Sequence, residues 1–127
     1  MTERFPDIEI YIMKPDPQAV RAWLTAALAD PLEDIRIVPG HAHWQASGAG
    51  RTIDIFLNEN AEKNFASLWI KQNHTPWNTD LDCARAAHQA LGYEIRCSDS
   101  GWQEDDQEEA SSGWIKLIRG EEKPFSW

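Results

Sequence analysis

The chain has 127 residues, of which 42% are hydrophobic and seven are tryptophan, and its formal net charge is −9. This length suits one self-sufficient core, and this composition excludes a disordered chain. The acidity disfavours nucleic acid and anionic membrane as partners, because both require a positively charged surface.

Neither a membrane span nor a secretion signal is evident. No apolar run reaches the roughly 20 residues of a span, and the start "MTERFPDIEI" lacks the apolar region of a signal peptide. We therefore expect a single cytoplasmic domain over residues 1–127. Cys83 and Cys97 are expected to be buried free thiols, because a helix packed on a sheet lies about 10 Å away, beyond disulfide reach. Free thiols agree with a reducing compartment.

The first half of the chain opens with a strand and then a helix. "IEIYIM" (8–13) alternates isoleucine with other residues, as a half-buried strand does. Asp16 is the expected N-cap of the next helix and Pro17 its first residue. The apolar stripe of this helix consists of Val20, Trp23, Leu24, Ala27 and Leu28. The pattern then predicts three strands, 34–38, 41–47 and 51–58, and a polar connector over 58–64.

The same order of elements then begins again. A strand is predicted over 66–72, and a helix follows it, capped by Thr79 or Asp80 and ended by Gly92. Further strands are predicted over 93–98 and 113–119. Between them a weak strand is expected to begin near Gly101-Trp102, followed by a mobile hairpin loop over the acidic residues 104–112. A calcium loop, or a docking site for a basic partner, is the alternative role of those acids.

Adding 60 to positions in the first half finds similar residues in the second half without a gap. Ile8 corresponds to Leu68 and Ile10 to Ile70. We therefore predict an α+β fold of tandem β-α-β-β-β modules, with repeat halves 6–58 and 65–119. The sheet is expected to be curved, mixed or antiparallel, with two helices on one side.

Tandem modules of this kind resemble the vicinal oxygen chelate superfamily, which includes glyoxalase I, extradiol dioxygenases and bleomycin-resistance proteins. "NTDLDCARAAHQALGYEIRC" is similar to the opening of the family's second module, and "RGEEKPFSW" is similar to its closing segment. The resemblance implies metal ligands on the first and last strands of each module. Here those places offer only Glu9 and the pair Glu121 and Glu122, which do not hold a transition metal by themselves. The resemblance therefore implies the metal-free branch, with no cofactor, no metal and no catalytic residue.

Two histidines in "GHAHW" (40–44) raise a separate metal question. His41 and His43 share one face of their strand, because alternate residues of a strand point the same way. A zinc site needs a third ligand, which His74 or Glu9 would have to supply from elsewhere. Solvated or edge-strand histidines are the alternative, and His88 is expected to be packed against its helix's neighbours.

Aliphatic residues on alternate strand positions, Ile35 and Ile37 among them, are expected to face the helices. The opposite side of the sheet would then carry aromatic and charged side chains together, an arrangement that suits a ligand-binding cleft. The predicted ligand-binding residues are Tyr11, Arg36, Asp54, Phe56, Trp69, Lys71, Arg96 and Trp114. A second core layer or a homodimer interface is the alternative.

The leading hypothesis is a non-enzymatic binding protein for a small, flat or zwitterionic ligand. An acidic interaction protein that captures a basic protein partner, such as a toxin-neutralising immunity protein, is the alternative. A metal-dependent lyase or dioxygenase is the third. Under the repeat, Arg36 and Arg96 should occupy equivalent strands, and at least one should pair with Asp54 or Glu9.

Overall fold

The computed structural model describes residues 7–48, 50–98 and 114–125. In these ranges the chain forms two helices and eight strands. Their order is β1 (Ile8–Met13), α1 (Pro17–Leu28), β2 (Leu32–Val38), β3 (His41–Gly48), β4 (Arg51–Glu62), β5 (Phe65–Ile70), α2 (Asp80–Leu91), β6 (Ile95–Ser98), β7 (Trp114–Ile118) and β8 (Glu121–Phe125). The predicted weak strand near Gly101-Trp102 and the loop 104–112 lie outside the described residues.

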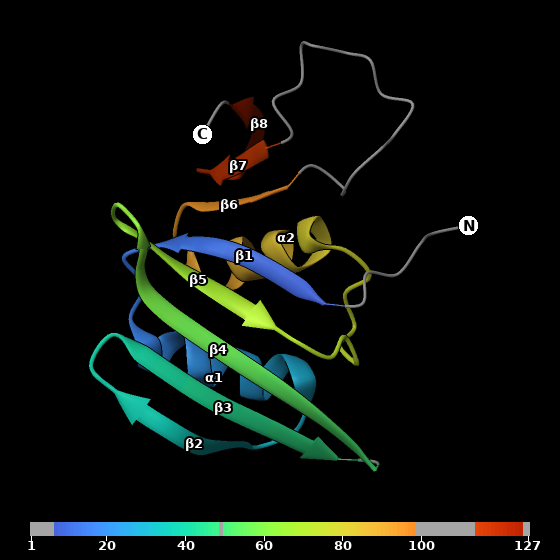
Figure 1. The fold of residues 1–127 in the computed structure, drawn as a ribbon. Coiled ribbons are helices and arrows are strands. Elements are labelled where there is room, and N and C mark those ends of the chain that lie inside the picture. The colour runs from blue at the N-terminus through green and yellow to red at the C-terminus, as the bar shows by residue number, and fades with distance from the viewer. Residues whose placement is uncertain (1–6, 49, 99–113, 126–127) are drawn as a thin grey trace.

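All eight strands belong to one sheet, in the order β2-β3-β4-β5-β1-β6-β7-β8, and every neighbouring pair is antiparallel. Both helices lie on the same side of this sheet (Figure 1). The predicted α+β class, with two helices on one side, is therefore confirmed. The two central strands, β5 and β1, come from different halves of the chain.

Both helices begin, and α2 ends, where their capping residues predict. The carboxylate of Asp16 accepts a hydrogen bond from the backbone N–H of Gln18 at 3.0 Å, and Pro17 is the first helical residue. Thr79 caps α2 by accepting from the backbone N–H of Asp82. Gly92 ends α2 with a φ of 81°, a left-handed conformation that glycine adopts without steric cost.

The core fills the space between the sheet and the helices. The alternating isoleucines of β1 and the central residues of β4 and β5 are fully or almost fully buried, and Val20 and Leu24 of α1 pack against them. The most buried large side chains are Ile8, Ile10, Ile12, Leu24, Ile55, Leu57, Leu68, Ile70, Ile95 and Leu117. The helix-facing sets predicted for β1, β4 and β5 are therefore confirmed.

A compact loop links β5 to α2 and is itself part of the core. Trp77, which is 7% exposed, stacks on Trp23 of α1 with ring centroids 5.2 Å apart. Asn73 lies beneath it, and its side-chain amide donates to the Trp77 carbonyl at 3.0 Å. The Asn73 oxygen accepts from both the hydroxyl and the backbone N–H of Thr75. These bonds satisfy polar groups that burial would otherwise leave without water.

The alternation predicts that Ile35 and Ile37 of β2 are packed against the helices, but both are exposed. They are 45% and 54% exposed, and Val38 is 37% exposed. β2 is an edge strand, and its register with β3 shifts between Asp34 and Arg36. The shift displaces Ile35, which lies between the two shifted pairs. Ile37 pairs with the buried Ala42 and so belongs to the helix side of the sheet, but it lies on the edge strand and stays exposed.

Two further boundaries differ from the predictions. Residues 58–62 continue β4 instead of beginning a polar connector, and Glu62 still pairs with Phe65. The closing segment contains a strand, β8, that was not predicted. The sequence of β8 does not resemble a strand, because it contains acidic residues and Pro124. Such residues are depleted in strands in general but are tolerated at a sheet edge.

Cys83 and Cys97 are both buried, as predicted, and both are free thiols. Burial raises the pKa of the Cys83 thiol well above its usual value, so this group stays protonated and unreactive. Within the described ranges, neither helix is long and apolar enough to cross a membrane.

Candidate functional site

The side of the sheet turned away from the helices carries most of the predicted site residues, and we call it the outer face. One row of cross-strand neighbours runs over all eight strands: Val38, His41, Asn58, Ser67, Tyr11, Arg96, Lys116 and Lys123. A parallel row contains Arg36, His43, Phe56, Trp69 and Glu9. Directly opposed side chains on one face are close enough to interact, so each row is a line of contacts.

Three rings from neighbouring strands, those of His43, Phe56 and Trp69, contact one another in sequence, and we call them the aromatic row. The His43 imidazole lies on Phe56 with centroids 4.2 Å apart and planes inclined by 19°. Phe56 in turn contacts Trp69 at 5.5 Å. The ammonium of Lys71 lies 5.7 Å from the Trp69 ring centroid, and the Trp69 indole N–H donates to Asp7 at 2.8 Å.

Asp54 is held by three side chains at the edge of the aromatic row. One carboxylate oxygen accepts from Gln45 at 3.0 Å and contacts His43 Nε2 at 3.0 Å, and the other accepts from Gln72 at 3.0 Å. The hydrogen bond from Gln45 is the main cause that lowers the pKa of Asp54, with smaller contributions from His43 and Gln72. Asp54 is therefore an anion whose oxygens are occupied.

His43 acquires a defined orientation from this carboxylate. A proton on Nε2 supplies the hydrogen bond to Asp54, and in the neutral imidazole Nδ1 is then an acceptor. His41 hydrogen bonds through Nδ1 to the Asn58 side chain on the neighbouring strand. Among the residues that the structure describes, no group of three or more His, Cys, Asp or Glu side chains could hold a metal ion.

A second cluster lies across β1, β6 and β7. Tyr11 meets Trp114 edge to face at 5.9 Å. Burial is the main cause that raises the pKa of the Tyr11 hydroxyl, followed by the negative charges of Glu9 and Glu62. Glu9 also accepts a hydrogen bond from the buried Ser67 hydroxyl at 2.9 Å. Tyr11 thus stays a neutral hydroxyl in the physiological pH range.

Arg96 belongs to this second cluster, whereas Arg36 does not. The Arg96 guanidinium lies over Phe65 at 4.3 Å and pairs with Glu94 at 3.0 Å, rather than with Asp54 or Glu9 as predicted. Arg36 is exposed on β2 and forms no ion pair with another described residue. The expectation that the two arginines occupy equivalent strands is wrong, because β2 is an edge strand and β6 lies beside β1.

The structure therefore divides the predicted site into two groups. Asp54, Phe56, Trp69 and Lys71 meet in one, and Tyr11, Arg96 and Trp114 meet in the other. The residue that the prediction missed is His43, which the sequence places opposite Phe56 on the neighbouring strand of a hairpin. The spacing of the hairpin could have revealed this pairing, had the histidines not been interpreted as solvated.

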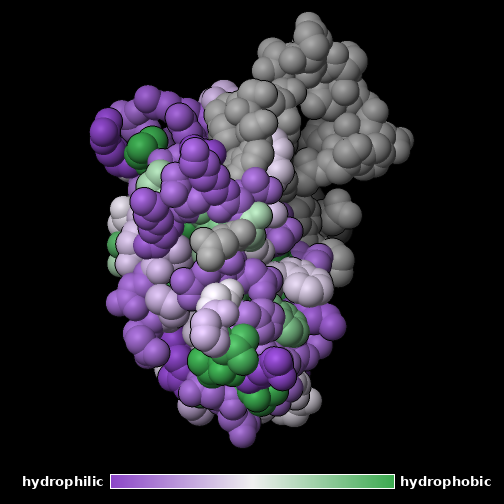
Figure 2. All heavy atoms as spheres, turned by 60° about the vertical axis from the view of Figure 1, so that its left-hand side comes forward, coloured by the Kyte–Doolittle hydropathy of each residue, from purple (hydrophilic) through white to green (hydrophobic). Residues whose placement is uncertain are grey.

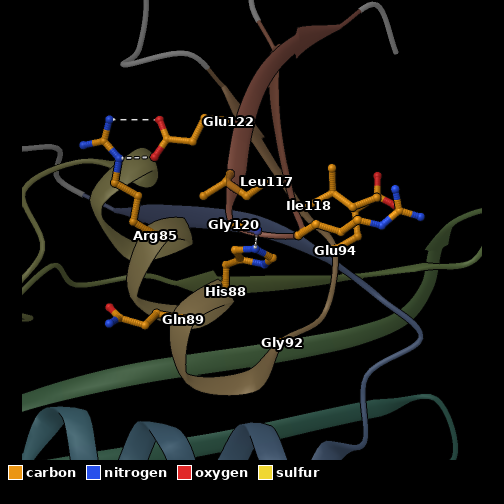
Figure 3. Close-up of a pocket in the computed structure, with 10 residues that line it drawn as sticks. Arg85, His88, Gln89, Gly92, Glu94, Leu117, Ile118, Gly120 and Glu122 are labelled. Carbon is orange, nitrogen blue, oxygen red and sulfur yellow. Dashed lines mark hydrogen bonds and ion pairs between the residues drawn. The ribbon is translucent and has the colours of Figure 1, made fainter.

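A cavity of about 560 Å³ lies elsewhere, between α2 and the turn that joins β7 to β8 (Figure 3). We call it the α2–β8 cavity. Its lining residues are Arg85, His88, Gln89, Gly92, Glu94, Leu117, Ile118, Arg119, Gly120 and Glu122. His88, expected to be packed, is half-buried and lines this cavity.

No protein-family model, curated protein or solved structure matches the chain.

Proposed function

We propose that the protein binds a small, flat or zwitterionic ligand against the aromatic row of its outer face and does not transform it. The observation that carries this proposal is the run of ring contacts, stacked between His43 and Phe56 and tilted between Phe56 and Trp69. These rings are half-buried, so part of each is accessible. Planar ligands bind well to such rings, because stacking adds to the burial of apolar surface.

One charged group and one hydrogen-bond acceptor beside the aromatic row support a zwitterionic ligand. The ammonium of Lys71 lies beside Trp69 and can meet an anionic group. The Nδ1 atom of His43, left as an acceptor by the bond to Asp54, can meet a donor such as an ammonium group. The second cluster contributes less, because Arg96 is already paired with Glu94.

Ligand binding should change tryptophan fluorescence, and the change should depend on Trp69. We expect at least one member of a panel of aromatic amino acids, aromatic acids and betaines to alter the emission of the wild type. Trp69→Ala should weaken its binding by about 10-fold or more, as the loss of a central aromatic contact does. Lys71→Gln should weaken an anionic ligand by several-fold, whereas Lys63→Gln, which removes an exposed lysine of the β4–β5 turn, should have no effect.

Unchanged emission across the panel, together with an unchanged indole N–H resonance of Trp69, would contradict the proposal. Binding that survives Trp69→Ala unaltered would place the ligand somewhere other than the aromatic row.

At the level of the fold, we propose that the two halves derive from a duplicated β-α-β-β-β module similar to that of the vicinal oxygen chelate superfamily. The order of elements along the chain supports it, since β1 to β4 with α1 is followed by β5 to β8 with α2. The unequal sheet positions of β2 and β6 restrict this similarity to the chain order.

An interaction protein is the second candidate, and the exposed edge strand β2 favours it. Ile35, Ile37 and Val38 are the large apolar residues that are most exposed among the described residues. Figure 2 shows apolar side chains gathered on the lower part of the surface, among hydrophilic ones. An edge strand can receive a strand from a partner, and the net charge of −9 favours a basic one.

This second candidate predicts that a charge on β2 blocks the partner. Where a neighbouring gene encodes a basic protein, Ile37→Lys should abolish co-purification with that protein, whereas Thr52→Lys, an exposed position on β4, should not. Equal capture by both variants would exclude β2 as the contact surface.

A further inference from the structure

The α2–β8 cavity is separate from the aromatic row and has its own chemistry. It is formed by the C-terminal half of α2, by Glu94 and by residues 117–122. Its volume of about 560 Å³ lies within the range of pockets that hold small organic molecules, roughly 300–1,000 Å³. Figure 3 shows His88 of α2 beside Gly120 of the β7–β8 turn, with Leu117 next to Gly120.

The inner wall of the cavity is apolar. Ile118 contributes aliphatic surface, whereas Leu117 lines the cavity but is only 1% exposed. The His88 ring has no polar atom left for a ligand, because its Nδ1–H donates to the Tyr93 carbonyl at 2.8 Å and its Nε2 accepts from the Gly120 N–H at 3.0 Å. Its carbon atoms therefore act as a flat apolar surface.

Most of the charges around the cavity are already paired. Arg85 forms a two-pronged pair with Glu122, with N–O distances of 2.7 and 3.1 Å (Figure 3). The pKa of Glu122 is lowered chiefly by this hydrogen bond. Glu94 is paired with Arg96 at 3.0 Å. The two ion pairs, Arg85–Glu122 and Arg96–Glu94, each combine one positive and one negative group, so neither leaves an unpaired charge for a ligand.

Arg119 differs from these paired groups because it forms no ion pair with another described residue. It lies in the turn between β7 and β8 with a φ of 53°, and its side chain is exposed. A lining guanidinium without a carboxylate partner can bind a carboxylate with two parallel hydrogen bonds.

We propose that the α2–β8 cavity binds a small monocarboxylate with an apolar body. The body rests on Ile118 and the His88 ring, and the carboxylate meets Arg119. The paired state of Arg85 and Glu94 disfavours a second charge on the ligand. This site does not depend on the aromatic row of the outer face.

Naphthalene-2-carboxylate is a suitable probe, and its uncharged carboxamide is the matched control ligand. Titration into ¹⁵N-labelled protein should shift the backbone resonances of Gly92 and Gly120. Arg119→Gln should weaken the carboxylate by about 10-fold, the scale of one hydrogen bond to a charged group, and leave the carboxamide unchanged. Arg36→Gln removes another exposed arginine without an ion pair and should change neither affinity.

Three outcomes would overturn the proposal. The first is equal binding of carboxylate and carboxamide to the wild type. The second is equal weakening by Arg119→Gln and Arg36→Gln, which would indicate a general charge effect. The third is a set of shifts confined to the outer face, or none at millimolar probe. Ile118→Trp, which fills the cavity, supplies an independent check, because it should abolish binding of both ligands while the remaining spectrum stays folded.

Discussion

Trp77→Ala should lower the free energy of unfolding by about 3–5 kcal/mol, the usual cost of removing a buried aromatic side chain. Trp77 is 7% exposed and stacks on Trp23, so its removal opens a space between α1 and the loop before α2. Urea denaturation followed by circular dichroism measures the loss.

The matched control for this substitution is Trp69→Ala. Trp69 is half-buried on the outer face, so the same truncation there should cost less than half as much. Similar losses for the two variants would show that the loop around Trp77 is not part of the core.

Asn73→Ala should lower the free energy of unfolding by about 2–3 kcal/mol, although it removes little apolar surface. Asn73 is 8% exposed, and its side chain joins the hydroxyl and N–H of Thr75 to the Trp77 carbonyl. Its loss leaves those buried groups with fewer partners, and water cannot replace all of them.

Chemical or thermal denaturation measures this second loss, and Gln89→Ala is its control because that amide is exposed on α2. The control should change stability by no more than about 0.5 kcal/mol. A loss for Asn73→Ala as small as that of the control would mean that the loop reorganises around the missing amide.

The helices and the central strands could be predicted from the sequence because their signals are local. Asp16 and Pro17 mark the start of α1, and Gly92 marks the end of α2, by capping chemistry alone. The alternating isoleucines of β1 identify its buried side. Each of these signals is contained within one turn of helix or one strand.

The errors concern properties that depend on the whole sheet. Alternation makes Ile35 and Ile37 resemble core residues, but it does not reveal that β2 is an edge strand with a bulge. The same limit applies to Arg36 and Arg96, whose matching positions in the sequence do not correspond to matching positions in the sheet.

The candidate sites also differ in whether a local sequence pattern could predict them. The outer face could be predicted because alternate residues share a side, and Phe56 and Trp69 do meet there. The α2–β8 cavity could not, because α2 and the turn at Arg119 are separated in the chain and no local pattern links them.

The central place of β1 determines when this strand can be paired during synthesis. β1 is made first, yet Ile8 pairs with Ile70 and Tyr11 pairs with Arg96. Strands β2 to β5 pair with their neighbours in the chain and can form hairpin by hairpin. Because synthesis proceeds at roughly 5–20 residues per second, the isoleucines of β1 stay unpaired for several seconds before β5 has been made. A strand whose isoleucines are fully buried in the finished sheet is thus exposed to aggregation while the chain is being made.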